Sequence, residues 1–560
     1  MTRPATRATK RRHAKGRDLT ALAQFLMLSG GPLRLLLALA AGAIAATAMP
    51  PLFFFPGLFA GMTALVWLID GAEKKRSFFG RIFGPAFRIG WMWGAGYALV
   101  ALHWVGFAFF IEPQATGWIA PFALLALSFG LGLFFAFGVQ AAHWFWADGG
   151  QRIVMLAAAL TVSEWLRGHI LSGFPFDLGG YVFSINEATM QGASLIGIYG
   201  LTFIALLAAA TPALIWPNAG ASLTRRLMPL GAALIVIAGM TGFGVWRLAR
   251  NEVTSLSSVR FRLVQPNIPQ TDKWAPEKAE AIFQSLLDLS AQLTGPQDTG
   301  LAGVTHLIWP ESVFPFVVAS HPDALARIAR MLPSGTMLIA GAAREDVAAT
   351  PGEDGELPAF NSILAINDVG EIIASYDKLR LVPFGEYVPF GFLFRALGFS
   401  ELVGTQSSFV PGAGSERSFA PYATPPVLPL ICYEAIFAGD LGPLAGEAAW
   451  ILNLTNDAWF AGSIGPEQHF QHARMRAVEE GKPLVRVANT GVTAIVDPYG
   501  RISGKLPTDI AGVLDGALSA PINATVYSRY RSLPLAVILG VAFAVAVLRN
   551  LLERRKGPQV

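Results

Sequence analysis

Long apolar runs dominate the first 248 residues of the chain and recur once near its C-terminus. A helix that crosses a membrane needs about 20 mostly apolar residues. The fifth run is the weakest because Glu164 interrupts it. The pattern predicts eight transmembrane helices, over residues 31–49, 52–70, 89–110, 119–146, 153–168, 196–216, 228–248 and 533–550.

Between residues 249 and 531 the pattern changes, because charged residues return and Pro and Gly separate shorter apolar runs. Short apolar runs that alternate with amphipathic stretches are typical of an α/β layer fold with buried strands. We expect strands over 259–264, 306–309, 337–342, 360–367, 427–432, 450–455, 484–488 and 493–496. We expect helices over 276–293, 321–331, 434–446 and 466–481.

The composition supports a membrane protein with one hydrophilic domain. The chain of 560 residues is 53% hydrophobic and only 14% charged, whereas an average soluble chain carries about 25% charged residues. A single cysteine excludes an internal disulfide and a cysteine-rich metal site. No metal or nucleotide motif is present, so we expect neither a metal nor a cofactor.

Lys and Arg residues occupy alternate loops of the apolar part. They lie in the N-terminal tail, in loop 71–88, at 152, at 225–226 and in the C-terminal tail, whereas loops 50–51, 111–118 and 169–195 have none. Basic loops stay in the cytoplasm, so both termini should be cytoplasmic and residues 249–530 should lie outside. One alternative is that the first segment is a signal peptide, cleaved after Ala46-Thr47-Ala48. The basic N-terminal tail could also bind nucleic acid, but its position beside a membrane span favours contact with anionic lipid.

These patterns divide the chain into five parts. They are a basic cytoplasmic tail (1–30), seven transmembrane helices (31–248), an outward-facing α/β domain (249–531), an eighth transmembrane helix (532–552) and a second basic cytoplasmic tail (553–560).

Three polar residues stand at the ends of expected strands, where catalytic groups collect in α/β folds. They are Glu311, Lys378 and Cys432. Alone, each has an ordinary explanation. Glu311 could be a turn residue, Lys378 a solvated loop lysine and Cys432 a small buried hydrophobic residue. Together they offer a thiol nucleophile, a carboxylate base whose pKa an apolar pocket would raise, and an ammonium for a developing oxyanion.

Glu, Lys and Cys in this order resemble the triad of the carbon–nitrogen hydrolase (nitrilase) superfamily, and NLTNDAWF at 453–460 and HARMRAVE at 472–479 resemble its segments after the cysteine. With the apolar helices attached, residues 31–550 resemble the bacterial apolipoprotein N-acyltransferase family. The shared stretches are EWLRG (164–168), GFP (173–175), LVQPNIPQ (263–270) with Lys273-Trp274, WPES (309–312), YDK (376–378), VPFGEYVP (382–389), ICYE (431–434), NDAWF with GPEQH (456–469) and ANTGVT (488–493).

The resemblance implies a polytopic α-helical membrane domain joined to a nitrilase-like αββα sandwich. It implies that Cys432 is the nucleophile, that Glu311 is the general base and later the acid, and that Lys378 stabilises the oxyanion together with the backbone N–H of Tyr433. The supporting active-site residues that it implies are Glu386, Tyr433, Glu434 and Trp274, with Glu386 orienting Lys378 or the thiol. Asn453 and Asn456 are weaker candidates, because such residues often only form turns.

The implied reaction is ping-pong acyl transfer at the bacterial inner membrane, with the catalytic domain facing the periplasm. The acyl donor is the sn-1 ester of a phospholipid, and the acceptor is the α-amine of a diacylglyceryl-modified N-terminal cysteine of an apolipoprotein. A membrane-anchored amidase with the same triad is the main alternative, and a transporter with an outside binding domain is another.

Residues 389–399 form an unusually apolar loop. We expect it to gate lipid entry, and an ordinary buried core helix is the alternative. The gating residues would be Phe390, Phe392, Phe394 and Leu397.

Overall fold

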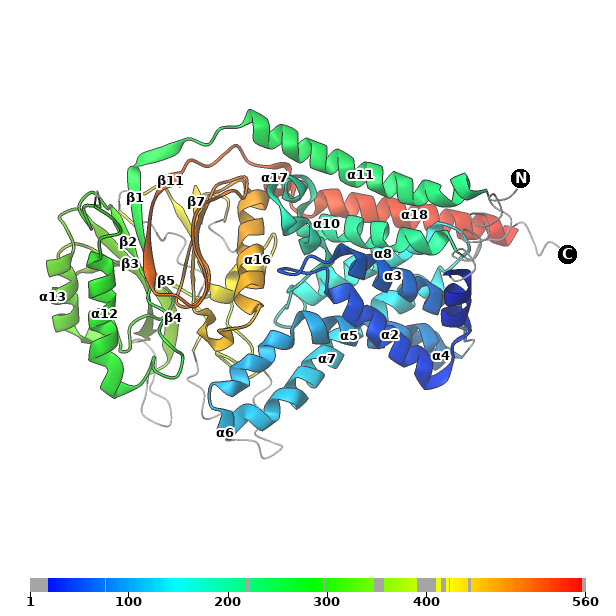
Figure 1. Cartoon of the computed structure of the whole chain (residues 1–560), viewed down its shortest axis with the longest axis horizontal. Helices are drawn as coiled ribbons and strands as arrows, with labels where there is room; N and C mark the ends of the chain where they lie inside the picture. The colour runs from blue at the N-terminus through cyan, green and yellow to red at the C-terminus, as the bar shows by residue number, and fades with distance from the viewer. Residues whose placement is uncertain are drawn as a thin grey trace, which may run out of the picture. The chain divides into compact units, whose positions relative to one another are not determined.

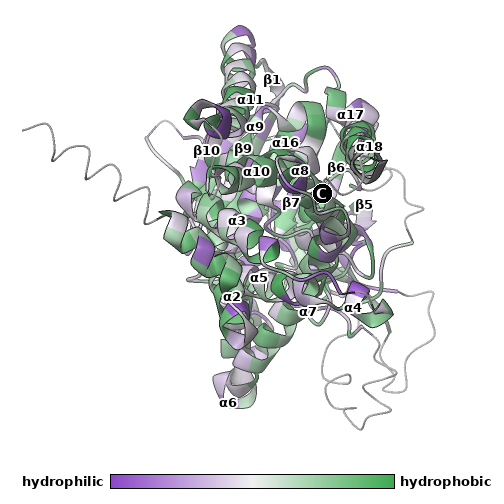
Figure 2. Cartoon of the chain, turned by 90° about the vertical axis from the view of Figure 1, so that its right-hand side faces the viewer, coloured by the Kyte–Doolittle hydropathy of each residue, from purple (hydrophilic) through white to green (hydrophobic). Residues whose placement is uncertain are grey.

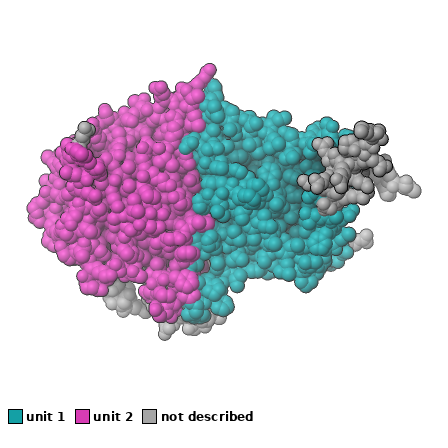
Figure 3. All heavy atoms as spheres, viewed as in Figure 1, with its two compact units in different colours: residues 1–106, 118–246, 530–560 teal, residues 107–117, 247–529 magenta. Residues whose placement is uncertain are grey.

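The computed structural model describes residues 19–75, 77–216, 222–296, 298–346, 357–389, 409–413, 419, 421–422, 424–441 and 445–555. The chain divides into two compact units, coloured separately in Figure 3. The first comprises residues 1–106, 118–246 and 530–560, and the second comprises 107–117 and 247–529.

The first unit is helical, and its helices are predominantly hydrophobic (Figure 2). Besides an apolar helix at Leu19–Leu28, its α-helices are α2 (Gly31–Ala46), α3 (Phe55–Asp70), α4 (Phe78–Ile82), α5 (Pro85–Ala101), α7 (Ala120–Trp144), α8 (Gln151–His169), α9 (Glu187–Met190), α10 (Ala193–Ala210), α11 (Leu223–Arg250) and α18 (Leu533–Arg555). The 3-10 helices η3 (Gly179–Ile185) and η4 (Thr211–Leu214) also belong to this unit. The 3-10 helices η1 (His103–Phe110) and η2 (Gly117–Ile119) cross its boundary with residues 107–117 of the second unit, which contain the single turn α6 (Pro113–Thr116).

Helices occupy all eight segments expected to span a membrane, but most are shorter or more polar than expected. Within the described residues, three helical stretches are long and apolar enough to cross a membrane: Pro113–Trp144, Ala193–Leu214 and Leu223–Arg250. The pair Pro85–Ala101 and His103–Phe110, bent by 52°, would make a fourth. The expectation of eight such helices is therefore met only in part.

Helix α8 is not among these candidates, and it carries the charged residues Arg152, Glu164 and Arg167, of which the last two form a buried ion pair. Arg167 donates to the Glu164 carboxylate, and it also donates to the carbonyl oxygens of Phe174 and Phe176. These bonds join the EWLRG and GFP stretches of the sequence, and they place two charges where a membrane span would have apolar side chains.

The second unit contains two β-sheets (Figure 1). The six-stranded sheet has the order β11-β1-β2-β3-β4-β5 and the five-stranded sheet the order β10-β9-β8-β7-β6. The strands are β1 (Ser255–Gln265), β2 (His306–Ile308), β3 (Met337–Glu345), β4 (Ala359–Ile366), β5 (Ile372–Asp377), β6 (Val427–Ile431), β7 (Trp450–Thr455), β8 (Leu484–Ala488), β9 (Thr493–Val496), β10 (Ile502–Leu506) and β11 (Gly512–Ser519).

Three hydrophobic clusters make this unit a four-layer α-β-β-α sandwich. Side chains of both sheets, such as Phe261 and Trp450, form the middle cluster. The second cluster packs α12 (Ala279–Ala291) and α13 (Pro322–Met331) on the six-stranded sheet, and the third packs α16 (Gly465–Glu480) on the other. The expected α/β sandwich is therefore confirmed. The remaining elements are η5 (Pro276–Lys278), η6 (Val318–Ser320), η7 (Cys432–Ile436), η9 (Asp457–Phe460) and α17 (Val526–Tyr530).

The strands expected from the sequence are all present, within a few residues of their expected ends, but three further strands were not predicted. These are β5, β10 and β11. The expected helix over 434–446 is wrong, because among the described residues 434–441 the 3-10 turn η7 ends at Ile436 and Gly439 then adopts a left-handed φ of 77°. A residue with positive φ ends a helix.

Candidate active site

The three predicted catalytic residues follow three different strands. Glu311 lies after β2 and Lys378 after β5 in the six-stranded sheet, whereas Cys432 follows β6 in the five-stranded sheet. The Lys378 Nζ lies 3.4 Å from the Glu311 Oε1, and the charges of both groups act on the Cys432 thiol. The two sheets thus bring the three groups into one cluster, in which Glu311 and Lys378 are buried and Cys432 is partly buried.

Asn361 on β4 ties the two carboxylates of the cluster together. Its Nδ2 donates to the Glu311 Oε1 at 2.8 Å and to the Glu386 Oε1 at 2.7 Å. The Lys378 Nζ donates to Glu386 at 2.9 Å. Glu386 is itself held by the backbone N–H of Val382, which donates to its Oε2 at 2.7 Å. This arrangement fixes the Lys378 ammonium between two carboxylates.

The turn after β7, in the five-stranded sheet, binds the second carboxylate oxygen of Glu311. The backbone N–H of Asn456 donates to the Glu311 Oε2 at 2.7 Å. The Asn456 side chain is bound by Gln270 at 2.9 Å and Asn489 at 3.0 Å. The stretches that carried the sequence resemblance therefore converge on one carboxylate.

Gly341 on β3 allows the turn of Glu311 to lie close to the strand. A Cβ at this position would lie 2.4 Å from the Glu311 Cα and 2.5 Å from the Ser312 nitrogen. Real Cβ atoms do not approach backbone so closely, so the position of Glu311 depends on a glycine here.

Glu434 connects the lysine and cysteine segments. Its Oε2 accepts from the Ile431 backbone N–H at 2.7 Å, and its Oε1 accepts from the backbone N–H of Leu379 at 2.7 Å and of Arg380 at 3.2 Å. Glu434 thus fixes the residues after Lys378 relative to the residue before Cys432.

Cys432 occupies a strained turn between β6 and η7. Its φ is 49°, a left-handed conformation that is uncommon for residues other than glycine and that often occurs at functional sites. Burial and the charge of Glu311 raise the pKa of the Cys432 thiol, and the Lys378 ammonium opposes them. The resting thiol is therefore protonated.

The pKa of Glu311 differs from the expectation. Burial would raise it, as expected for an apolar pocket, but the Lys378 and Lys273 ammoniums and the hydrogen bonds from Asn361 and Asn456 outweigh burial, so the pKa lies below its usual 4.5. The resting site therefore contains a Glu311 carboxylate beside a neutral thiol.

Lys273 is a second buried lysine in this cluster. Its Nζ donates to the Glu311 backbone oxygen at 3.4 Å and lies 5.8 Å from the centre of the Trp274 ring. Burial lowers its pKa to about 8, although the charges of Glu311 and Cys432 raise it. The neighbouring Trp274 is 48% exposed, so unlike Lys273 it is not buried in the cluster.

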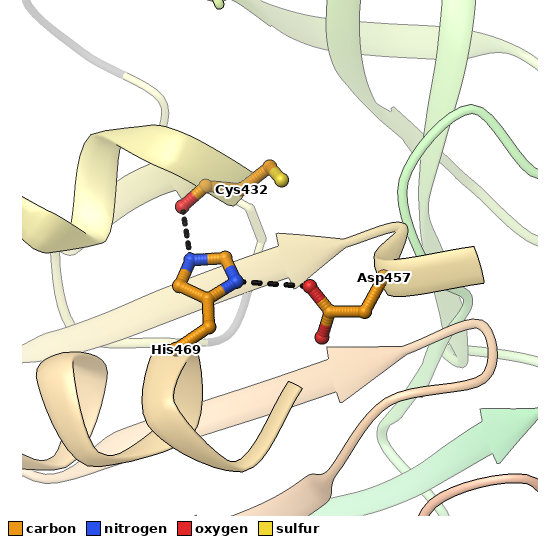
Figure 4. A group of neighbouring side chains, drawn as sticks. All are labelled: Cys432, Asp457 and His469. Carbon is orange, nitrogen blue, oxygen red and sulfur yellow. Dashed lines mark hydrogen bonds and ion pairs between the residues drawn. The ribbon is translucent and has the colours of Figure 1, made fainter. Parts of the chain in front are cut away.

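A buried histidine contacts the backbone of Cys432 (Figure 4). The His469 Nε2 donates to the Cys432 carbonyl oxygen at 3.0 Å, and its Nδ1 lies 2.9 Å from the Asp457 Oδ1. The potential metal-ligand atoms of Cys432, Asp457 and His469 lie within 4.8 Å of one another. Because both imidazole nitrogens already have protein partners, we interpret the group as a hydrogen-bonded network rather than a metal site.

The network continues into β7 and β8. The Arg486 guanidinium donates to the Asp457 Oδ2 at 2.8 Å and to the Asn453 side-chain oxygen. Asn453 in turn donates to the Leu430 carbonyl oxygen at 3.0 Å. Asn453 therefore supports the strand that precedes Cys432 and is not part of the carboxylate cluster.

Most predicted site residues come together, but their roles stay predictions. The Tyr433 ring is buried and packs edge-on against Phe437 at 5.1 Å, so of Tyr433 only the backbone is a candidate for the reaction. Three contributors were missed as functional residues: Asn361, Lys273 and His469. Lys273 and His469 stand in stretches that carried the resemblance, whereas Asn361 has no local signal. The residues of the apolar loop, Phe390, Phe392, Phe394 and Leu397, lie outside the described residues.

Comparisons with known proteins cover both units. The carbon-nitrogen hydrolase family matches residues 260–525, and the family described as apolipoprotein N-acyltransferase N-terminal domain matches residues 41–211. An apolipoprotein N-acyltransferase of Rhodopseudomonas palustris is 42% identical, over 95% of this chain and 98% of its own. An apolipoprotein N-acyltransferase of Bradyrhizobium diazoefficiens is 41% identical, over 96% of this chain and 98% of its own. The crystal structure of an amidase from Nesterenkonia is 19% identical, over 51% of this chain and 98% of its own, with a TM-score of 0.31 that is too low to carry an argument.

Proposed function

Because the chain belongs to the apolipoprotein N-acyltransferase family, we propose that it transfers a fatty acyl chain from a phospholipid to apolipoproteins. The donor bond is the sn-1 ester, and the acceptor is the free α-amine of the diacylglyceryl-modified N-terminal cysteine. The acyl chain travels as a thioester on Cys432. The observation that carries this proposal is the meeting of the buried Glu311 and Lys378 side chains with the partly buried Cys432 thiol in one cluster.

In the first half-reaction, Glu311 takes the proton of the Cys432 thiol as the sulfur attacks the ester carbonyl. The tetrahedral oxyanion lies against the Lys378 ammonium and the Tyr433 N–H. The carbon–oxygen bond then breaks, Glu311 returns the proton to the leaving oxygen, and lysophospholipid departs. Glu386 and Asn361 support this step because they hold Lys378 and Glu311 in place.

In the second half-reaction, the acceptor amine attacks the thioester. Glu311 takes a proton from the amine, the carbon–sulfur bond breaks, and the proton passes to the Cys432 sulfur. The products are an amide on the apolipoprotein and the free enzyme. A site that excludes water favours amine attack over hydrolysis.

The membrane part gives this reaction its location. We place the enzyme in the bacterial inner membrane with eight transmembrane helices, both termini in the cytoplasm and the domain 249–531 in the periplasm. The alternating basic loops support this topology. Both substrates are lipid-anchored, so an enzyme held in the same membrane meets them at a raised effective concentration. In this arrangement the enzyme is surrounded by inner-membrane lipids. The apolar loop 389–399 would admit the phospholipid donor to the site.

The amidase alternative is less favoured. A small C–N substrate needs no membrane part, yet the relative from Rhodopseudomonas palustris matches 95% of this chain, and the N-terminal family model matches residues 41–211 in its apolar part. No nucleic-acid partner is proposed.

Intact-mass measurement tests the proposal. The full chain in detergent micelles, incubated with phospholipid, should gain one fatty acyl group, and Cys432→Ala should gain none because the chain has a single cysteine. Addition of a diacylglyceryl-cysteine peptide should then remove the acyl group and acylate the peptide. The proposal is wrong if no adduct forms, or if water discharges the adduct as fast as the peptide does.

A further inference from the structure

The imidazole of His469 is aimed at one peptide bond of the nucleophile turn. A carbonyl oxygen can only accept, so the 3.0 Å contact between the His469 Nε2 and the Cys432 oxygen makes the nitrogen the donor. Figure 4 shows this carbonyl oxygen facing the ring, with the Cys432 sulfur at the other end of the residue. The bond therefore acts on the main chain of Cys432 and leaves its sulfur free to react.

This carbonyl belongs to the same peptide unit as the Tyr433 N–H. In a planar trans peptide the C=O and N–H point in opposite directions, so anchoring the oxygen on one side directs the N–H to the other. A hydrogen bond to a carbonyl also polarises the peptide and strengthens its N–H as a donor, because linked hydrogen bonds are cooperative. The contact to His469 thus affects the N–H that is the predicted oxyanion donor.

Buried partners hold the imidazole in place. Asp457, 2.9 Å from the His469 Nδ1, is bound by Arg486 at 2.8 Å and by the Thr455 hydroxyl at 3.1 Å. His469, Asp457, Arg486 and Thr455 are at most 6% exposed. Two strands and two helical segments therefore fix one ring that makes one bond to the nucleophile turn.

We propose that His469 is a positioning residue that orients and polarises the Cys432–Tyr433 peptide so that the Tyr433 N–H can stabilise the oxyanion. The inference rests on the proposed function, because it assumes that an acyl group is transferred through Cys432. It predicts that His469 matters for attack on a carbonyl and not for the reactivity of the thiol as such.

Two reactions of the single cysteine separate these effects. Acylation of Cys432 by a p-nitrophenyl ester passes through an oxyanion, whereas alkylation by iodoacetamide is a substitution at carbon that forms no oxyanion. His469→Leu should slow acylation by about 10- to 100-fold, because a small misplacement of a catalytic group can cost about 100-fold in rate. The alkylation rate should stay within about twofold of wild type.

Conservative variants give a second test if His469→Leu does not fold. The amide nitrogen of Gln reaches the position of Nε2, and that of Asn reaches only the position of Nδ1. His469→Gln should therefore restore most of the acylation rate, and His469→Asn should not. His306→Leu is the matched control, because it removes another buried histidine whose Nε2 binds a carbonyl oxygen, that of Tyr422 at 2.9 Å.

The proposal is overturned if His469→Leu acylates at the wild-type rate, if acylation and alkylation fall in parallel, or if the Gln and Asn variants behave alike. The p-nitrophenyl ester also separates this inference from the proposed function. If wild type is acylated by the ester but not by phospholipid, the proposed function fails while the comparison of His469 variants still decides the inference.

Discussion

Replacing Lys273 with Met should stabilise the protein near neutral pH. Burial lowers the pKa of Lys273 from 10.5 to about 8, and each pKa unit corresponds to about 1.4 kcal/mol. Keeping this lysine charged in the folded state therefore costs about 3 kcal/mol below pH 8. Methionine fills a similar volume and carries no charge, so this cost disappears in the variant.

The sign of the pH dependence follows from proton binding. Between pH 8 and 10.5 the unfolded chain holds the Lys273 proton while the folded chain has lost it, so wild-type stability rises with pH across this window. The advantage of Lys273→Met should therefore be largest below pH 8, shrink as pH rises and vanish above about pH 10.5.

Thermal unfolding of the full chain in detergent micelles, followed by tryptophan fluorescence between pH 6.5 and 10.5, measures this difference. Lys278→Met is the matched control, since Lys278 lies on the same segment, is about half exposed and pairs with Asp272 at 2.7 Å. It should give no stabilisation. A Lys273→Met variant that is less stable than wild type at pH 7, or whose advantage does not change with pH, would refute the reasoning.

Three further predictions concern catalysis and topology. Glu311→Gln and Lys378→Met should each lower the rate of Cys432 acylation by at least about 10²-fold in folded protein, the usual scale for a lost base or oxyanion donor, and a wild-type rate would remove that residue from its role. Gly341→Ala should lower the same rate by about 10²-fold because its Cβ would displace the Glu311 backbone, whereas Gly446→Ala, with open space around it, should not. A reporter enzyme fused after residue 251 should be active only in the periplasm, and cytoplasmic activity would overturn the proposed topology.

The strands that were predicted are those whose own residues are apolar. The burial of β7 and β8 is continuous, and continuous apolar runs are visible in a sequence. Strand β11 was missed because Gly512, Asp515 and Gly516 interrupt its pattern. It is held by long-range partners, such as the Arg262 guanidinium that binds Asp515 at 2.6 Å. A single sequence gives no sign of such a partner.

The residues of the candidate site likewise fall into those that the sequence could predict and those that it could not. Glu311, Lys378 and Cys432 could be found because each follows an apparent strand and because their chemistry is complementary. Asn361 could not be found, because its importance depends on two carboxylates that only the folded sheet brings within 2.8 Å of its amide. The lowered pKa of Glu311 was missed for a related reason: an apolar environment is visible in the sequence, but the two nearby ammoniums are not.

The pairing of β1 with β11 has a consequence for how the catalytic unit could be moved between proteins. Ser255, near the start of the unit, pairs with Ser519, near its end, so the entering and leaving chains are separated by about one strand spacing of 5 Å. A module whose ends adjoin can be inserted into a host loop with little loop-closure entropy, and it can also be circularly permuted. Residues 253–521 are therefore a candidate for insertion into a loop of an unrelated scaffold and, with their ends joined by a short linker, for circular permutation.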